Sequence, residues 1–349
     1  MQPPKRILIV RLSAIGDCIH GLPVACRIRD AWPDTHISWV VEGRTAELLR
    51  DHPAIDQLVQ VPRKWLKSPR TVLQLRRQLR EIRPEVALDL QGLSKSAVVA
   101  RLSGAKARIG FTAPDGREIS RWLNNTLVEA SAPHVVDRYL ELLSPLEVPD
   151  CEVRFGLPEF TAENASIDQF VKNAKLEAGF AIINVGAGWP SKRWPTERLA
   201  EVSRHLAKKQ GLPAVIVWAG ADEQKSAEQI VTMVGTGAVL APRTTLRELA
   251  ALTRRSRFFV SSDTGPLHLA AAVGTSCIGL FGPMSAMRNG PYGQQHISIQ
   301  NICLSGSSRS KRTADDASMR AISVAEVCAA CDQLIERTGG TAAKAIVAA

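Results

Sequence analysis

The sequence predicts an α/β protein built from two doubly wound domains. Short apolar runs alternate with helical stretches through both halves of the chain. The runs are rich in Val, Ile and Leu, as expected of strands that are buried on both faces. Strands alternating with helices connect by right-handed crossovers and form parallel sheets. The length of 349 residues suits two domains of roughly 100–200 residues each.

The first half predicts strands at 6–11, 37–41, 58–61 and 85–90, with a helix over 18–32. The second half repeats the rhythm, with strands at 180–185, 214–218, 237–240, 258–262 and 277–281. Its predicted helices cover 196–209, 223–234, 245–254, 266–273 and 324–337. Two such sheets that face each other place a ligand cleft between the carboxyl ends of their strands.

The domain junction is predicted in the stretch 145–178, which is proline-rich at its start and has few signals of buried strands. A polar helix over 162–176 closes this stretch. We therefore predict an N-terminal domain at 1–160, a C-terminal domain at 161–335 and a tail at 336–349. The polar segment 305–317 is predicted to be a loop, and the Ala-rich end of the chain is expected to fray.

The composition is that of an ordinary globular protein. Hydrophobic residues make up 45% and charged residues 22%, which argues against wholesale disorder. The opening apolar run 7–10 is too short for a secretory signal, and no run approaches the ~20 residues of a membrane span. Seven scattered cysteines predict free thiols in the cytoplasm. The pair Cys328 and Cys331 lacks the partners of a zinc site.

The net charge of +10 predicts an anionic partner. Eight Lys and Arg residues lie between positions 63 and 83, against the single acid Glu81. Trp65 is the only aromatic residue in this basic stretch, whereas base-stacking surfaces use several. A phosphorylated substrate or a membrane surface is therefore favoured over nucleic acid.

The first motif is the segment 11–23, Arg-Leu-Ser-Ala-Ile-Gly-Asp-Cys-Ile-His-Gly-Leu-Pro, where the first strand turns into the first helix. Gly16 permits a tight turn and close approach by a ligand. Asp17 is either the N-cap of the helix or a general base, since an ordinary carboxylate is ionised at neutral pH. Spacing alone leaves both interpretations open. For His20, a packing role is favoured.

The second motif is the segment 261–272, which follows an apolar strand. Asp263, Thr264 and Gly265 form a turn, and Pro266 suits the first turn of a helix. Backbone N–H groups at a helix start can hold a diphosphate, and the Thr264 hydroxyl adds a donor. Asp263 as a simple N-cap is the alternative, but it leaves His268 on the same helix end unexplained.

Two further loops follow predicted strands. In 184–195, glycines expose backbone N–H groups and Lys192 supplies a point charge for phosphate, although a solvated loop is the alternative. In 218–223, an acid just past a strand end can hold ribose hydroxyls or cap the next helix. No D-x-D sequence is present, so cations and helix ends are expected to neutralise a donor diphosphate.

Taken together, these motifs resemble the bacterial lipopolysaccharide heptosyltransferases (glycosyltransferase family 9), and heptosyltransferase I most closely. The resemblance runs from Ile7 to about Tyr292. The residues that carry it are Gly16-Asp17 with Leu22-Pro23, the Lys192 loop, Asp263-Thr264-Gly265 with His268-Leu269, and the segments 39–42, 89–96 and 279–283. The sequence departs from many relatives near its C-terminus, where Cys303 and Met319 remain of a Cys- and Arg-rich stretch.

The resemblance implies a GT-B fold, inversion at the anomeric carbon, and neither a cofactor nor a metal. Its donor is ADP-L-glycero-β-D-manno-heptose, and its acceptor is the Kdo region of the lipopolysaccharide inner core, on anionic Kdo-lipid A at the cytoplasmic face of the inner membrane. Asp17 is then the base. The implied donor-binding residues are Ser13, Lys192, Glu223, Asp263, Thr264, Gly265 and His268. Arg63, Lys64 and Lys67 are the predicted acceptor-binding residues, because carboxylates and phosphates bind cations.

Three other functions remain open at this point. A sugar-nucleotide epimerase on the same two-domain plan would consume donor without an acceptor. A Rossmann oxidoreductase would need a G-x-G-x-x-G sequence after the first strand, which is absent. A non-catalytic, basic nucleic-acid-binding protein would show salt-sensitive retention of DNA or RNA.

Overall fold

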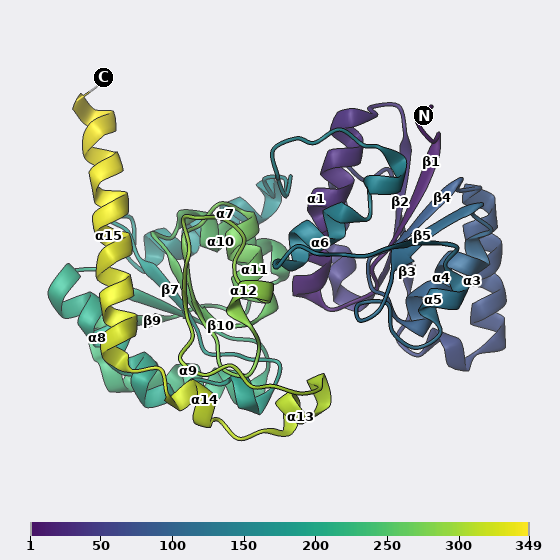
Figure 1. Cartoon of the computed structure of the whole chain (residues 1–349). Helices are drawn as coiled ribbons and strands as arrows, with labels where there is room; N and C mark the ends of the chain where they lie inside the picture. The colour runs from purple at the N-terminus through teal and green to yellow at the C-terminus, as the bar shows by residue number, and fades with distance from the viewer. Residues whose placement is uncertain (1, 348–349) are drawn as a thin grey trace. The chain divides into compact units, whose positions relative to one another are not determined.

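The computed structural model describes residues 2–347 of the chain. The chain divides into two compact units, Met1–Pro158 (unit 1) and Glu159–Ala349 (unit 2). In each unit a parallel sheet carries helices on both faces (Figure 1). The predicted class, two doubly wound α/β units, is therefore confirmed.

Unit 1 contains a six-stranded sheet with the order β3-β2-β1-β4-β5-β6. Its strands are β1 (Arg6–Val10), β2 (His36–Glu42), β3 (Gln57–Val61), β4 (Val86–Asp89), β5 (Ala107–Phe111) and β6 (Thr126–Val128). Its helices are α1 (Ile15–Ala31), α2 (Ala46–Leu49), α3 (Pro69–Ile82), α4 (Ser94–Ser103), α5 (Ser120–Leu123) and α6 (Val135–Glu141).

The two faces of this sheet are covered by different helices. Helices α1 and α6 pack against each other on one face, and α3, α4 and α5 form a layer on the other (Figure 1). Leu75, Leu79 and Ile82 of α3 are buried with Leu8 and Val10 of β1 in one apolar cluster. Their spacing of three and four residues gives α3 one apolar stripe and leaves its other positions to charged residues.

Unit 2 repeats the pattern with the strand order β12-β11-β10-β7-β8-β9. Its strands are β7 (Ala181–Asn184), β8 (Ala214–Val217), β9 (Ala238–Leu240), β10 (Phe259–Ser262), β11 (Cys277–Leu280) and β12 (Ile297–Ile299). Its helices are α7 (Thr161–Asn173), α8 (Thr196–Gln210), α9 (Ala221–Val234), α10 (Leu246–Arg255), α11 (Gly265–Ala272), α12 (Ala286–Asn289), α13 (Ser308–Thr313), α14 (Ala317–Arg320) and α15 (Val324–Val347).

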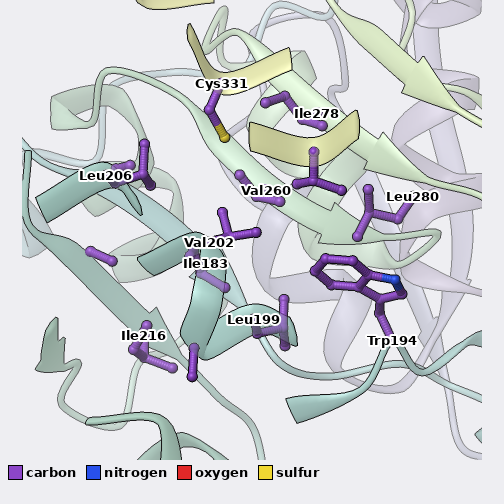
Figure 2. Close-up of a cluster of buried hydrophobic side chains, with 14 of the residues drawn as sticks. Ile183, Trp194, Leu199, Val202, Leu206, Ile216, Val260, Ile278, Leu280 and Cys331 are labelled. Carbon is purple, nitrogen blue, oxygen red and sulfur yellow. The ribbon is translucent and has the colours of Figure 1, made fainter. Parts of the chain in front are cut away.

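The core of unit 2 joins the last helix to the sheet. Leu199 and Val202 of α8 face Ile183 and Val260 of the strands, and Cys331 of α15 lies in the same cluster (Figure 2). Burial raises the pKa of the Cys331 thiol, which makes this cysteine a packing residue. Burial also raises the pKa of Cys328, so both thiols of the C-x-x-C pair ionise less readily than a free cysteine.

The structure differs from the predictions at sheet edges and in the C-terminal region. Strands β5, β6 and β12 were not predicted, because β6 and β12 have three residues each and β5 contains Arg108 and Gly110. The segment 305–317 is not all loop: Ser307 caps α13 by accepting a hydrogen bond from the Ser310 N–H. Helix α15 continues to Val347 instead of ending at 337, as its alanines favour; residues 348–349 of the predicted tail lie outside the described residues.

Candidate active site

Each sheet has one switch point, where the chain reverses the direction in which strands are added. It lies between β1 and β4 in unit 1, and between β7 and β10 in unit 2. Ligands of doubly wound sheets bind outside the carboxyl ends of the strands at this point. Asp17 follows β1, Lys192 follows β7 and Asp263 follows β10. Both carboxylates that the sequence singled out therefore lie at switch points.

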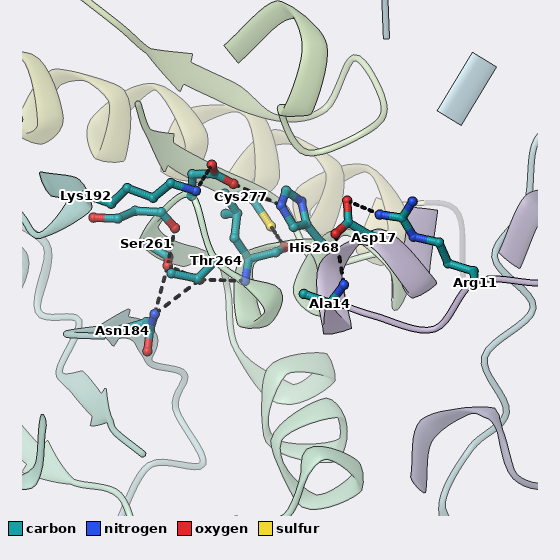
Figure 3. A network of polar contacts seen from close by, with 12 residues as sticks. Arg11, Ala14, Asp17, Asn184, Lys192, Ser261, Thr264, His268 and Cys277 are labelled. Atoms are coloured by element: carbon teal, nitrogen blue, oxygen red, sulfur yellow. Dashed lines mark hydrogen bonds and ion pairs between the residues drawn. The ribbon is translucent and has the colours of Figure 1, made fainter. Parts of the chain in front are cut away.

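In unit 1, two groups hold the Asp17 carboxylate (Figure 3). The Ala14 N–H donates to Asp17 Oδ2 at 3.0 Å, and Arg11 Nη2 lies 2.8 Å from Asp17 Oδ1. Helix α1 begins at Ile15 with Ala14 as its N-cap. The alternative that Asp17 is the N-cap is therefore wrong, since Asp17 lies inside the first turn and bonds back to the cap residue.

The arginine beside Asp17 is itself fixed. Arg11 is 7% exposed; its Nη1 donates to the Leu90 carbonyl at 3.0 Å, and its guanidinium carbon lies 5.4 Å from the centre of the Tyr139 ring. Burial lowers the pKa of Arg11, but the neighbouring Asp17 carboxylate raises it above the ordinary value. A fixed cation thus orients a carboxylate whose side chain remains 41% exposed.

In unit 2, Asp263 lies between two donors, Lys192 and His268. Lys192 Nζ is 2.5 Å from Asp263 Oδ2, and His268 Nε2 is 3.2 Å from Asp263 Oδ1. Burial would raise the pKa of Asp263, but the hydrogen bond from His268 and the charge of Lys192 hold it below the ordinary value. The buried His268, which an N-cap role for Asp263 left unexplained, thus has a partner.

The N-cap of α11 is Thr264, so the alternative of Asp263 as the cap is wrong. Thr264 Oγ1 accepts from the Leu267 N–H at 3.3 Å and from Asn184 Nδ2 at 3.4 Å. It also lies 2.9 Å from Ser261 Oγ, whose own proton goes to the Ser262 carbonyl. The Thr264 proton therefore points either to Ser261 or to a ligand.

The start of α11 offers fewer backbone donors than the sequence indicated. Pro266 has no N–H, and those of Leu267 and His268 are used by Thr264. Of the first-turn residues that the structure describes, Gly265 is the one whose N–H remains to meet an oxyanion. A diphosphate at this helix end would therefore depend chiefly on Gly265 and Lys192.

Lys192 ends a short 3₁₀ helix (Pro190–Lys192) in the loop after β7. Its ammonium lies 4.4 Å from the centre of the Trp189 ring, and the Arg312 guanidinium lies 6.0 Å from the same ring. Lys192 is 14% exposed at its side chain. The alternative of a solvated loop charge is wrong, because Lys192 is held between a carboxylate and an aromatic face.

Glu223 lies in the first turn of α9, whose N-cap is Gly220. Glu223 Oε2 accepts from the Ala219 N–H at 2.7 Å, and its carboxyl group packs against Gly186 of the Lys192 loop. Burial raises the pKa of Glu223, partly opposed by the Ala219 N–H and the charge of Arg193. The N-cap alternative is wrong for both acids of this segment, since Asp222 and Glu223 lie inside the first turn. The Glu223 carboxylate closes one side of the glycine loop.

The other predicted site residues lie in unit 1. Arg63, Lys64 and Lys67 are exposed in the segment between β3 and α3. Ser13 is half-buried in the turn before Asp17, whereas the other predicted donor-binding residues belong to unit 2. The structure thus groups Lys192, Asp263, Thr264 and His268 directly, and places Ser13 in the unit of the predicted base.

The sequence motifs contain three residues to which no role was assigned, although the structure shows that they support the site: Arg11, Asn184 and Ser261. Arg11 holds Asp17, while Asn184 and Ser261 hold Thr264. Each lies at a strand end, and only the strand pairing reveals which side chains meet. His20 is buried, with its ring edge-on to His134 at 5.8 Å, in line with the favoured packing role. Within residues 2–347, no cluster of three His, Cys, Asp or Glu side chains could hold a metal.

Comparison with known families gives one clear match. The profile of glycosyltransferase family 9 (heptosyltransferase) matches residues 72–317. Lipopolysaccharide heptosyltransferase 1 of Pseudomonas aeruginosa is 29% identical over 303 residues, which cover 84% of this chain and 83% of that protein. The protein of the same name from Escherichia coli K12 is 28% identical, with 84% and 92% covered.

Solved structures agree with the sequence comparisons. A glycosyl transferase family 9 protein of Veillonella parvula has a TM-score of 0.83 at 23% identity, with 95% of this chain and 98% of that chain covered. The E. coli heptosyltransferase WaaC with ADP has a TM-score of 0.74 at 25% identity, with 95% and 99% covered. The predicted GT-B fold and the predicted resemblance are both confirmed.

Proposed function

The chain belongs to glycosyltransferase family 9 (heptosyltransferase), and on that premise we propose that it transfers heptose from ADP-L-glycero-β-D-manno-heptose to the Kdo region of the lipopolysaccharide inner core. The similarity to lipopolysaccharide heptosyltransferase 1 over 84% of the chain supports this acceptor. The observation that carries the proposal is the half-exposed Asp17 at the switch point of unit 1, together with the Lys192–Asp263–His268 group at that of unit 2.

Asp17 is the general base. Its carboxylate takes the proton of the acceptor hydroxyl as that oxygen bonds to the anomeric carbon of heptose. The bond from the anomeric carbon to the diphosphate breaks on the opposite face, so the configuration inverts and ADP leaves. Arg11 and the Ala14 N–H hold the carboxylate during this step, because proton transfer needs a base in a fixed position.

The donor is held by unit 2. The Lys192 ammonium has three donors, and one of them is used by Asp263. The remaining donors, with the Gly265 N–H and the Thr264 hydroxyl, would stabilise the charge that develops on the leaving diphosphate. Glu223 would accept hydrogen bonds from the ribose hydroxyls.

The acceptor is held by unit 1. Arg63, Lys64 and Lys67 are exposed cations that fit the carboxylates of Kdo and the phosphates of lipid A. Ser13, in the turn before Asp17, would contact the donor. The enzyme would work in the cytoplasm, peripheral to the inner membrane, and no helix of residues 2–347 is long and apolar enough to span a membrane.

The direct test is incubation of the purified protein with ADP-heptose and a deacylated Kdo acceptor, followed by mass spectrometry. The expected product is the acceptor plus one heptose, formed equally well in the presence of EDTA because Lys192 and the α11 terminus take the diphosphate charge. Consumption of donor without acceptor would instead indicate an epimerase. An unchanged acceptor and donor would overturn the proposal.

A further inference from the structure

The positive charge of the chain is concentrated in one part of unit 1. Residues 63–128 contain 14 Lys and Arg and 5 Asp and Glu, so they carry +9 of the net charge of +10. The other residues, more than four-fifths of the chain, are nearly balanced. A field of one sign over one surface attracts an extended anionic partner.

The same segment exposes large apolar side chains. Trp122 is 79% exposed, Leu73 61%, and Leu66, Ile119 and Leu127 more than 40%. A tryptophan that is mostly in water is unusual in a folded protein, where such rings are well buried on average. Helix α5, which carries Trp122, also carries the exposed Arg121.

Leu73 of α3 and Trp122 of α5 belong to one layer of the unit, whereas Leu66 and Ile119 lie just before these helices and Leu127 lies on the edge strand β6. Helix α4 contacts both α3 and α5, and the three helices cover the same face of the sheet (Figure 1). Leu73 and three arginines of α3 line an open hollow of about 350 Å³: Arg76, Arg77 and Arg80. Apolar groups that would enter an acyl layer thus lie among cations that would bind phosphate.

We propose that the α3–α5 layer of unit 1 docks on the surface of an anionic lipid bilayer, with Trp122 and Leu73 entering the interface and the α3 arginines contacting headgroup phosphates. Tryptophan is favoured at the membrane–water boundary. Each Lys or Arg that lies near an anionic bilayer adds a comparable amount to the free energy of binding. A nucleic acid would use the charge but would not require exposed leucines. This docking rests on the proposed function, because an enzyme whose acceptor is anchored in the membrane reaches that acceptor at the membrane surface.

Vesicle co-sedimentation tests the proposal without donor or acceptor, so it can fail separately from the catalytic assignment. The full-length protein is mixed with vesicles of phosphatidylcholine alone or with one-quarter phosphatidylglycerol. Binding to the anionic vesicles, weakened by salt, is expected. The Trp122→Ser variant should bind about tenfold more weakly, and Arg76→Ser about fivefold more weakly.

Two matched controls lie in unit 2. Met287 is 72% exposed, and Lys208 is an exposed helix cation; Met287→Ser and Lys208→Ser should bind vesicles like the wild type. Trp122→Ser should also keep full turnover of a soluble, deacylated acceptor, which shows that the variant is folded. Equal loss in all variants, binding independent of anionic lipid, or retention by RNA without vesicle binding would each overturn the proposal.

Discussion

Asp17 in unit 1 and Asp263 in unit 2 both follow a strand at a switch point, yet their side chains are 41% and 10% exposed. Asp17 pairs with one arginine and accepts one backbone N–H. Asp263 lies between a lysine and a histidine, and both of its oxygens are occupied. The same residue type thus stands in two different environments, each beside the switch point of its own sheet.

The exposure of the side chain decides which of the two carboxylates can act as a base. A base must reach the proton it removes, and Asp17 offers accessible oxygen atoms. A buried carboxylate with two donors is a fixed anion that positions its partners instead. In the proposed function, Asp263 would therefore hold Lys192 and His268 for a ligand, whereas Asp17 would take the proton from one. The predictions below test this division between the units.

The largest effect is expected from Asp17→Asn. Asparagine can still accept from Ala14 but takes no proton, so kcat should fall by about 10²-fold or more. Affinity for ADP, measured by calorimetry, should stay unchanged because the change lies in unit 1. A kcat within a few-fold of the wild-type value would show that Asp17 is not the base, and that the exposure of Asp17 and Asp263 does not separate their roles.

The second-largest effect, on the affinity for ADP, is expected from Lys192→Met. This change removes the cation proposed for the diphosphate and leaves Asp263 buried beside one partner instead of two. The dissociation constant of ADP should rise by about 30-fold, since loss of one member of a buried charge pair costs about 2 kcal/mol or more. Lys192→Arg, which keeps the charge, is the control. Unaltered ADP affinity in a folded Met variant would show that Lys192 serves the fold alone.

The third effect is on stability and its dependence on pH. Because its pKa is lowered in the folded state, Asp263 stabilises the fold fully above its unfolded-state pKa of about 3.9. That contribution is lost as the pH falls through the lower folded-state pKa. Asp263→Asn should therefore cost about 2 kcal/mol at neutral pH, and the thermal unfolding curves of variant and wild type should begin to approach each other only as the pH falls below about 3.9.

The control for this measurement is Asp150→Asn. The Asp150 carboxylate also pairs with an arginine, Arg27, but its side chain is 95% exposed. Exposed ion pairs contribute little, so this variant should match the wild type at every pH. A difference between Asp263→Asn and wild type that does not shrink as the pH falls below about 3.9 would show that packing, and not the charge of Asp263, carries the stability.

Much of the fold could be predicted from the sequence, because runs of apolar residues indicate buried strands. The central strands β1, β7 and β10 were predicted within one or two residues. The edge strands β6 and β12 were not predicted, although the equally short edge strand β9 was. Tertiary pairing, which the local sequence does not encode, defines such short strands.

The residues of the candidate site could be proposed from the sequence, but the contacts between them could not. Asp17, Lys192 and Asp263 were found from their position after strands. Sequence could not show that Asp263 pairs with Lys192, 71 positions away, or that Thr264 and not Asp263 caps α11. Both Asp and Thr are good N-caps, so a choice between neighbours depends on backbone angles that only the fold sets.

The smallest effect is expected from Gly186→Ala, which tests whether unit 2 positions a third group for the donor. A Cβ at this position would lie 2.5 Å from the Glu223 carboxyl atoms, so Glu223 must leave the Ala219 N–H. The flexible side chain can move at little cost to folding, but ADP affinity should fall about fivefold, the value of one hydrogen bond. Gly188→Ala is the control, because a Cβ there meets nothing within 4 Å. Equal ADP affinity in both variants would remove Glu223 from the donor site and leave Lys192 and Gly265 to hold the nucleotide.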